Sequence, residues 1–364
     1  MVRLVSRAFP GAALIRSGRI VPGGFLLGLW VALLAVVVLR WDRLGDFLVA
    51  GAPDERVALL ALAASLVGVW WMAHEGVKRL HPGSASADLL PPALAGNRVG
   101  LVALMTVGLL AVAALLTPLL APFDPVAQGD LITGRLLPPS REHLLGTDQF
   151  GRDQLSRLLY GARISLAIGL VAMGLAVVLG TVVGALAGYV GGWLDALLMR
   201  IVDMVIAFPR LVLLIAIVAL FRPSILLIMV ILGLTQWPHI ARIVRGEVRA
   251  VREREFVLAG RALGFGSGRI LFRHILPNSL APLVVAATLG VGDAIVVEAV
   301  LSFLGLGVLP PTPSWGGMVA EGRTHMLGAW WLTVVPGLAI VTVVLSFNLA
   351  GDALRDALDP RGRS

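Results

Sequence analysis

The chain has 364 residues, of which 58% are hydrophobic and only 14% are charged. Soluble globular proteins carry about 25% charged residues, so most of the surface of this chain must face an apolar medium. The composition excludes a soluble enzyme, a disordered chain and, despite the net charge of +8, a nucleic-acid-binding protein. It predicts an all-α membrane protein that crosses the bilayer several times.

Apolar stretches long enough to form membrane helices recur along the whole chain. A spanning helix needs about 20 predominantly apolar residues. By this criterion eight spans are predicted, at residues 25–39, 57–73, 99–120, 164–189, 204–221, 225–240, 280–301 and 330–350.

A segment rich in proline, serine and glycine divides the chain into two parts. This segment, residues 81–97, contains HPGSASADLLPP and is predicted to be a cytoplasmic linker. Residues 1–80, with the first two spans, form an N-terminal extension. Residues 98–361 form a six-helix body with a polar external loop at 121–160 and a cytoplasmic loop at 242–278.

The distribution of basic residues predicts which side of the membrane each loop faces. Eight arginines lie between Arg242 and Arg273. Cytoplasmic loops of membrane proteins are enriched in Lys and Arg, so this basic loop is predicted to be cytoplasmic. With eight spans, both termini then lie on the cytoplasmic side.

The basic loop has the pattern of two short helices joined by a turn. Gly264 is predicted to end the first helix with a positive φ, and the second helix runs from Arg269 towards Pro277. Two amphipathic helices of this kind can rest on the lipid surface or form a docking element for another protein. Small and apolar residues recur at helical spacing in the first helix, at Phe256, Ala259, Gly260 and Leu263.

Two acidic residues, Asp293 and Glu298, interrupt the apolar span at 280–301. Five residues of helix separate them by about 140°, so they are not expected to share a face. Acids inside a bilayer usually face a bundle interior or water. Either residue is therefore a candidate for lining a pathway, and together they are candidates for a proton relay in a secondary transporter.

The same acids raise an enzymatic alternative. Gly290-Val291-Gly292-Asp293 resembles the GxGD motif of intramembrane aspartyl proteases, with Asp203 as the candidate second carboxylate. Such enzymes share one proton between two carboxylates. Asp203 lacks the tyrosine that precedes the partner aspartate in that pattern, so the protease is the less favoured hypothesis.

Other signatures of enzymes are missing from the sequence. There is no phosphate-binding loop of the G-x-x-x-x-G-K-[ST] type, because the only lysine is Lys78, so the chain is not expected to bind or hydrolyse ATP. His143, Asp148 and Asp153 stand five residues apart in a glycine-containing segment and share no helical face, so no metal site is predicted there.

Gly180, Gly184 and Gly188 form a stripe of small residues on the span at 164–189. Such a stripe lets two helix backbones approach closely within the membrane. The neighbour is either another helix of this chain or a helix of a partner permease subunit, and the sequence does not distinguish the two.

Several longer motifs occur in an order typical of one family of membrane proteins. In the basic loop, nine residues separate Gly264 from His274, and Leu276-Pro277 follows, which is the spacing of the EAA motif. Four further segments match in order: HLLGTDQFGRDQLSRLLYGARISL (143–166), GYVGGWLDALLMRIVDMVIAFP (188–209), EAVLSFLGLGVLPPTPSWGGMVAEGR (298–323) and FNLAGDALRDALDPR (347–361). Together they resemble the C-type permease subunits of ABC importers for dipeptides, oligopeptides and nickel.

This resemblance implies a type I ABC importer permease fold of six helices, preceded here by two extra transmembrane helices, in a prokaryotic plasma (inner) membrane. It implies a subunit that is not an enzyme and forms half of a pathway for di- or oligopeptides, or alternatively for nickel or another small solute. The implied partners are a homologous B-type permease, two cytoplasmic ATP-binding subunits and an extracytoplasmic solute-binding protein. ATP and magnesium belong to the ATPases, so no cofactor is expected in this chain.

In the family that the chain resembles, the basic loop couples the permease to the ATPase. The residues that the resemblance assigns to this coupling loop are Glu255, Leu258, Ala259, Gly260, Arg261, Leu263, Gly264, His274 and Pro277. The sequence departs from the motif at Leu258 in place of glutamate, at Gly260 in place of the second alanine and at His274 in place of an isoleucine-like residue. Arg210 and Asp293 also stand where small or neutral residues are expected.

Overall fold

The computed structural model describes residues 97–221 and 224–358, and every regular element within these ranges is helical. The predicted spans at 25–39 and 57–73, and the linker up to residue 96, lie outside the described residues. The α-helices are α7 (Arg98–Leu115), α8 (Thr117–Leu120), α9 (Gln154–Val190), α10 (Gly192–Ala207), α11 (Arg210–Leu220), α12 (Ile225–Arg252), α13 (Glu255–Ala262), α14 (Ser267–Ile270), α15 (Leu276–Asn278), α16 (Leu280–Phe303), α17 (Trp315–Gly322) and α18 (Trp331–Leu358). A π-helical turn, η1 (Leu271–Ile275), joins α14 to α15, and a 3-10 turn, η2 (Arg323–His325), follows α17.

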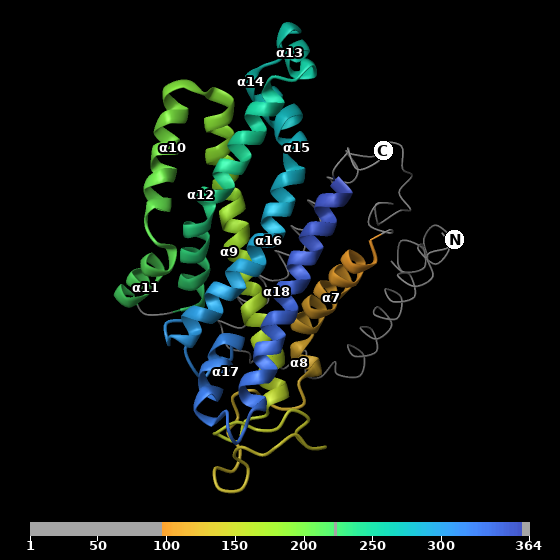
Figure 1. Ribbon diagram of the computed structural model, residues 1–364, viewed down its shortest axis with the longest axis vertical. Coiled ribbons are helices and arrows are strands. Elements are labelled where there is room, and N and C mark those ends of the chain that lie inside the picture. The colour runs from red at the N-terminus through yellow and green to blue at the C-terminus, as the bar shows by residue number, and fades with distance from the viewer. Residues whose placement is uncertain (1–96, 222–223, 359–364) are drawn as a thin grey trace, which may run out of the picture.

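The long helices run along the long axis of the molecule (Figure 1). One end carries α13 and α14, and the opposite end carries α17 and the loop between α8 and α9; these are called the α13 end and the α17 end. Helices α9, α12, α16 and α18 are long and apolar enough to cross a membrane. They coincide with the predicted spans at 164–189, 225–240, 280–301 and 330–350.

The span predicted at 204–221 is not a single continuous helix. The chain there forms two helices, α10 and α11, bent by 81° at the break between them. The cause is Pro209, whose ring disfavours helical geometry in the preceding residue, and Phe208 accordingly has an extended backbone. The predicted span at 99–120 is also divided, since Pro118 lacks the N–H that would continue α7 through α8.

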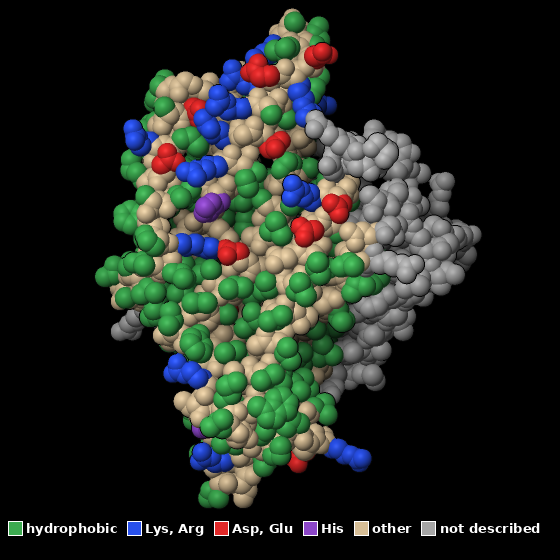
Figure 2. All heavy atoms as spheres, viewed as in Figure 1, with side chains coloured by type: hydrophobic (Ala, Val, Ile, Leu, Met, Phe, Trp, Pro, Cys, Tyr) green, Lys and Arg blue, Asp and Glu red, His purple; other side chains and the backbone are tan. Residues whose placement is uncertain are grey.

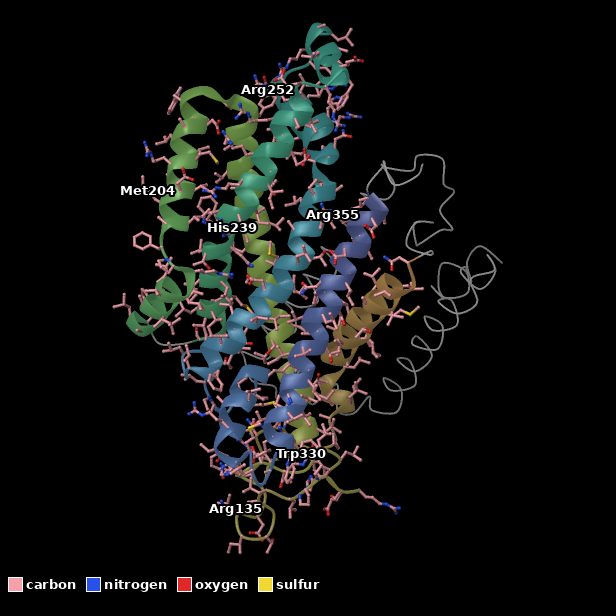
Figure 3. The ribbon with its side chains drawn as sticks, viewed as in Figure 1. Arg135, Met204, His239, Arg252, Trp330 and Arg355 are labelled. Carbon is pink, nitrogen blue, oxygen red and sulfur yellow. The ribbon has the colours of Figure 1, made fainter. Side chains whose placement is uncertain are left out.

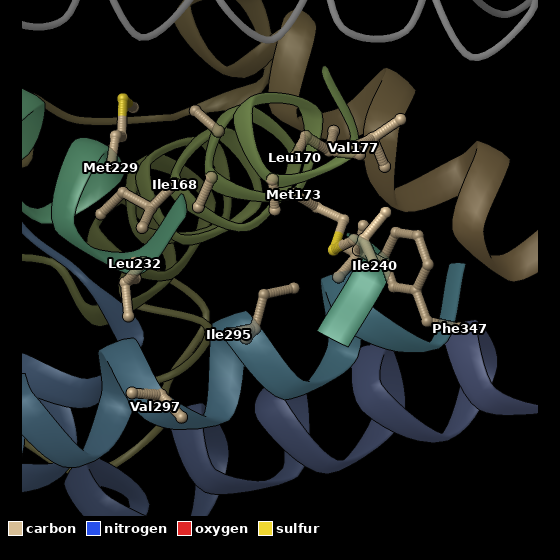
Figure 4. Packing of buried hydrophobic residues seen from close by; sticks show 14 of the residues in the cluster. Ile168, Leu170, Met173, Val177, Met229, Leu232, Ile240, Ile295, Val297 and Phe347 are labelled. Atoms are coloured by element: carbon tan, nitrogen blue, oxygen red, sulfur yellow. The ribbon is translucent and has the colours of Figure 1, made fainter. Parts of the chain in front are cut away.

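The largest hydrophobic cluster of the described residues surrounds α9. Figure 4 shows Ile168, Met173 and Val177 of α9 among side chains of α12, α16 and α18, including Ile240 and Phe347. Because α9 is a central neighbour of the other long helices, its apolar residues are buried around much of its circumference. This explains why the sequence of α9 shows no clear polar face.

The glycine stripe packs inside this chain. A Cβ added at Gly184 would lie 2.4 Å from the carbonyl oxygen of Ala241 in α12, and one at Gly180 would lie 2.6 Å from Cβ of Ile240. A Cβ at Gly188 would lie 2.8 Å from the carbonyl oxygen of Arg245. The stripe therefore serves the contact between α9 and α12, so of the two neighbours that the sequence left open, the structure favours the helix of this chain over a partner permease.

This contact leads to a prediction about stability. We expect Gly184→Ala to lower the stability of the protein by about 1–3 kcal/mol, the usual cost of overpacking a well-packed contact. Gly174→Ala is the matched control, because a Cβ at Gly174 of the same helix meets nothing within 4 Å. Thermal unfolding of the purified protein in detergent should give a lower Tm for Gly184→Ala only, and equal Tm values would contradict the packing argument.

Both predicted loops are shorter than expected. Helix α9 begins at Gln154 rather than after 160, because the Asp153 carboxylate accepts a hydrogen bond from the Ser156 N–H at 2.8 Å and caps the helix. At the other end, α12 continues to Arg252, so the first part of the predicted loop at 242–278 is helical.

Candidate functional site

The connection between α12 and α16, here called the α13 loop (residues 253–279), is built around a helix-ending turn at Gly264. The Gly264 N–H donates to the Arg261 carbonyl at 2.9 Å and the Phe265 N–H donates to the Gly260 carbonyl at 3.0 Å. These two bonds form the Schellman motif. Gly264 has φ +77°, which confirms the predicted positive φ.

The predicted coupling residues do not all lie on one surface. Gly260 is buried beneath Phe265, whose Cδ2 would lie 3.3 Å from an added Cβ, so Gly260 fixes the turn and is not available for docking. His274 stacks on the Phe265 ring at a centroid distance of 5.8 Å, and Pro277 is half-buried in α15. The coupling residues that are exposed are Glu255, Leu258, Ala259, Arg261, Leu263 and Gly264.

The exposed surface of the α13 loop is partly apolar. Leu263 is 75% exposed and Phe272 is 71% exposed, with Phe256 and Leu258 also on the surface. Basic side chains surround this end of the molecule, whereas hydrophobic side chains dominate its middle (Figure 2). An exposed apolar patch with a basic surround is typical of a surface that contacts another protein or the lipid surface.

Arginines connect the α13 loop region to the helices around it. Nη1 of Arg252, which Figure 3 places at the α13 end, donates to the Tyr189 carbonyl at the end of α9 at 2.7 Å. Arg245 forms a bidentate ion pair with Asp195 of α10, with 2.6 Å between Nη2 and Oδ2. These contacts fix the end of α12, from which the α13 loop begins, to α9 and α10.

A second polar cluster lies within the apolar part of the molecule. The Asp293 carboxylate of α16 forms an ion pair with Arg210 at the start of α11 and accepts a hydrogen bond from Gln236 Nε2 of α12 at 2.8 Å. Asp203 forms its own ion pair with Arg242 at 2.6 Å. Each aspartate pairs with a different arginine, and among the described residues no contact joins the two carboxylates, so the structure gives no support to the less favoured protease hypothesis.

Glu298 has a different environment from Asp293, as their predicted 140° separation requires. It is fully buried and accepts hydrogen bonds from the Ser302 hydroxyl at 2.7 Å and the Ser165 hydroxyl at 3.2 Å. The Trp315 N–H donates to the same Ser165 oxygen. This network joins α9, α16 and α17, so Glu298 packs helices together and does not line a pathway in this structure.

A third cluster, here called the charge ring, lies at the α17 end. Asp148 accepts from Arg152 Nε at 2.6 Å and also pairs with Arg157. Glu321 of α17 pairs with Nη2 of Arg152 at 3.1 Å and with Nη2 of Arg157 at 2.9 Å. Asp148 and both arginines are buried, so the ring fastens the external loop and the start of α9 to α17.

The remaining external residues have separate partners. His143 Nδ1 lies 2.9 Å from Asp153 Oδ1, whereas Asp148 belongs to the charge ring. The three residues considered as metal ligands therefore do not meet at one point. Exposed Asp130 accepts hydrogen bonds from the Thr133 hydroxyl and the Ile132 N–H, which lower its pKa. Among the described residues, no group of three or more metal-ligating side chains occurs.

Sequence analysis missed several residues that the structure brings together. No local pattern in the sequence marks four of these residues as interaction partners: Gln236, Arg152, Arg157 and Glu321. Arg210 was noted only as a departure from a family pattern. The one usable signal was its position directly after Pro209, where a break in the apolar span exposes polar backbone and favours polar neighbours.

Known proteins resemble this chain over most of its length. The profile of the family described as "Binding-protein-dependent transport system inner membrane component" matches residues 180–364, and "N-terminal TM domain of oligopeptide transport permease C" matches residues 93–139. The dipeptide transport system permease protein DppC of Alkalihalophilus pseudofirmus is 45% identical over 268 residues, which is 74% of this chain and 88% of that protein. The Escherichia coli protein of the same name is 45% identical over 271 residues, 73% of this chain and 90% of that protein.

One solved structure with a related arrangement is the MetNI methionine ABC transporter in an inward-facing conformation. It matches 56% of this chain and 96% of its own, at 22% identity and a TM-score of 0.48.

Proposed function

The chain belongs to the family of binding-protein-dependent transport system inner membrane components, and from this premise we propose that it forms half of a translocation pathway for di- and oligopeptides. Relatives named as dipeptide transport permeases share 45% identity with it over most of both chains. The match of residues 93–139 to a domain of oligopeptide permease C also supports a peptide cargo. Nickel or another small solute is the alternative cargo.

The proposed coupling element is the α13 loop. The observation that supports it is the rigid turn at Gly264, which holds exposed Ala259, Leu258 and Leu263 beyond the end of α12. A docking element must keep its backbone conformation when a partner exerts force on it. The Schellman motif, with Phe265 packed on Gly260, stabilises one conformation of the turn. Closure of the ATPases would then move this loop and the helices attached to it as a rigid body.

The proposed orientation places the α13 end in the cytoplasm of a prokaryotic cell. The arginines that gather at this end support it, because basic residues favour the cytoplasmic side. Helix α18 ends towards the same end of the molecule (Figure 1), so the C-terminus is proposed to be cytoplasmic, and with eight spans the N-terminus is too.

The proposed partners are a homologous B-type permease, two cytoplasmic ATPase subunits that bind ATP and magnesium, and an extracytoplasmic solute-binding protein. This chain contributes no phosphate-binding loop, since its sequence lacks one. Residues 1–80 are proposed to be an addition to the permease body, because the matched family profiles begin at residue 93.

Reconstitution of the whole complex tests this function. A tag on this chain is used to purify the complex from its native membrane, and the complex is placed in vesicles with ATP inside and solute-binding protein outside. We expect ATP-dependent uptake of radiolabelled dialanine, and no ATP hydrolysis by the isolated chain. Uptake driven by a proton gradient without ATP would contradict the importer, and uptake of nickel but not of dialanine would contradict the peptide cargo.

A further inference from the structure

We propose that Arg210, Gln236 and Asp293 form a binding site for the charged termini of a zwitterionic peptide within the membrane. These three residues are called the terminus site. The inference rests on the proposed function and deepens it, because it states which chemical groups of the cargo the pathway recognises.

The terminus site lies near the middle of the membrane-spanning part. Asp293 is about 20 Å along α16 from its first residue, and Gln236 is about 16 Å along α12, at a rise of 1.5 Å per residue. The hydrocarbon core of a bilayer is about 30 Å thick, so both side chains lie far from either surface. Arg210 reaches the same level because it begins α11 directly after the 81° bend (Figure 1).

The exposed fractions of the Asp293 and Arg210 side chains indicate which surroundings these charges have. The Asp293 side chain is 52% exposed and that of Arg210 is 25% exposed. Charged groups at this depth are rare against lipid and usually face a water-filled cavity or another protein segment. Exposed His239, three residues further along α12 and half-way along the molecule in Figure 3, extends the same polar region. This part of the surface therefore belongs to the pathway between the two permeases.

The terminus site has hydrogen-bonding capacity that the described residues do not use. Within them, Nε and Nη2 of Arg210 and Oε1 of Gln236 are buried and have no hydrogen-bond partner. Both hydrogen bonds to Asp293 fall on Oδ2, which leaves Oδ1 for another donor. A buried donor without a hydrogen-bond partner costs free energy. A ligand that pairs with such donors therefore gains more binding free energy than a ligand that contacts groups already hydrogen-bonded.

A peptide has the groups that match this capacity. Nε and Nη2 are the two parallel donors with which arginine binds a carboxylate, and they suit the C-terminal carboxylate of a peptide. Oδ1 of Asp293 suits the N-terminal ammonium group. Binding exchanges the ion pair between Arg210 and Asp293 for two ion pairs with the peptide, so no unpaired charge is created in a region of low dielectric. The termini are common to all peptides, so the site accepts any side chains between them.

The bend before α11 supplies the movement that this exchange requires. In the present conformation the arginine donors Nε and Nη2 are buried, so the guanidinium must turn to meet a carboxylate. Arg210 follows Phe208 and Pro209, where the backbone is not helical, so a change in the bend moves Arg210 relative to α16 without breaking a helix.

Binding of three peptides to the purified complex tests the terminus site. Saturation-transfer NMR is used, without the solute-binding protein, on dialanine, N-acetyl-dialanine and dialanine amide. We expect the wild-type complex to bind dialanine roughly tenfold more tightly than either blocked peptide, the usual effect of losing one hydrogen bond to a charged group. Asp293→Asn should abolish the discrimination against N-acetyl-dialanine. Arg210→Lys keeps the charge but lacks the paired donors, and should reduce the discrimination against the amide without affecting that against N-acetyl-dialanine.

The matched controls are Arg242→Lys and Asp203→Asn, which alter a separate ion pair outside the terminus site and should leave the discrimination unchanged. If the Asp293→Asn variant no longer co-purifies with its partners, the terminus site is tested with Arg210→Lys alone. That variant preserves the ion pair, and its binding of dialanine is compared with its binding of dialanine amide. Equal binding of all three peptides to the wild type, no binding at all, or equal weakening of all three in the variants would overturn the terminus site. Failure of the wild-type complex to import dialanine would instead overturn the proposed function.

Discussion

Gly264→Val is expected to reduce both the co-purification of the ATPases and the uptake of dialanine by roughly tenfold or more. An added side chain at Gly264 would meet nothing within 4 Å, so the effect comes from the backbone and not from a clash. Gly264 has φ +77°, a conformation that costs an ordinary L-residue about 1–2 kcal/mol and a β-branched residue more. The chain relieves this strain by opening the turn, which moves α13 away from α14.

The matched control for this variant is Gly266→Val in the same loop. Gly266 has φ −63° and ψ 149°, a conformation that valine adopts readily, so this variant should keep near wild-type uptake. Ala259→Arg tests the surface itself, because a long charged side chain at exposed Ala259 would hold two docked surfaces apart. Its control is Ala250→Arg, at an exposed position of α12 outside the α13 loop, which should leave ATPase binding unchanged. Normal ATPase binding by both Gly264→Val and Ala259→Arg would show that the α13 loop is not the coupling element.

Asp148→Asn is expected to cause the largest loss of stability, about 3–5 kcal/mol, the usual result of removing one partner from a buried ion pair. Asp148 neutralises both Arg152 and Arg157, which are 4% and 2% exposed, and an amide cannot balance their charge. The external loop should then separate from α17 and become open to proteases.

Thermal unfolding and limited proteolysis in the external loop measure this effect. Asp130→Asn is the control, because Asp130 lies exposed in the same loop and its carboxylate bonds only to Thr133 and Ile132 nearby. If Asp148→Asn and Asp130→Asn unfold at the same temperature and are cleaved at the same rate, the charge ring does not hold the loop.

The sequence predicted those features that depend on neighbouring residues. Apolar composition over about 20 residues is enough to identify a spanning helix, so α9, α12, α16 and α18 were found. The positive φ of Gly264 was also predictable, because the end of a helical pattern followed by glycine is a local signal. Both successes required no knowledge of which helices are neighbours.

Two errors in the predicted boundaries had signals that were present in the sequence. Pro209 interrupts the apolar run at 204–221, and the residue before a proline is disfavoured in a helix, so the break between α10 and α11 was predictable. Asp153 precedes the helical pattern of α9 and is a preferred capping residue. Hydropathy alone placed the start of this helix too late, because polar residues in its first turns lowered the apolar score.

The clusters that join distant segments were not predictable from one sequence. Arg152 and Glu321 are 169 residues apart in the chain, and Arg210 and Asp293 are 83 apart. A sequence states which residues are charged, but the packing of the helices decides which charges meet. The same reason left the neighbour of the glycine stripe undetermined. It also left both Glu298 and Asp293 as candidates for lining a pathway, although Glu298 is fully buried and Asp293 is half exposed.

The unbroken length of α12 has a mechanical consequence. About 24 Å of helix separate Gln236 from Arg252, at 1.5 Å per residue, and the helix continues through Pro238 although that residue removes one backbone hydrogen bond. Close glycine contacts with α9 prevent α12 from bowing sideways on one side. If the α13 loop couples to the ATPases as proposed, a displacement of this loop would be passed along α12 to Gln236 and would move one side of the terminus site relative to Asp293.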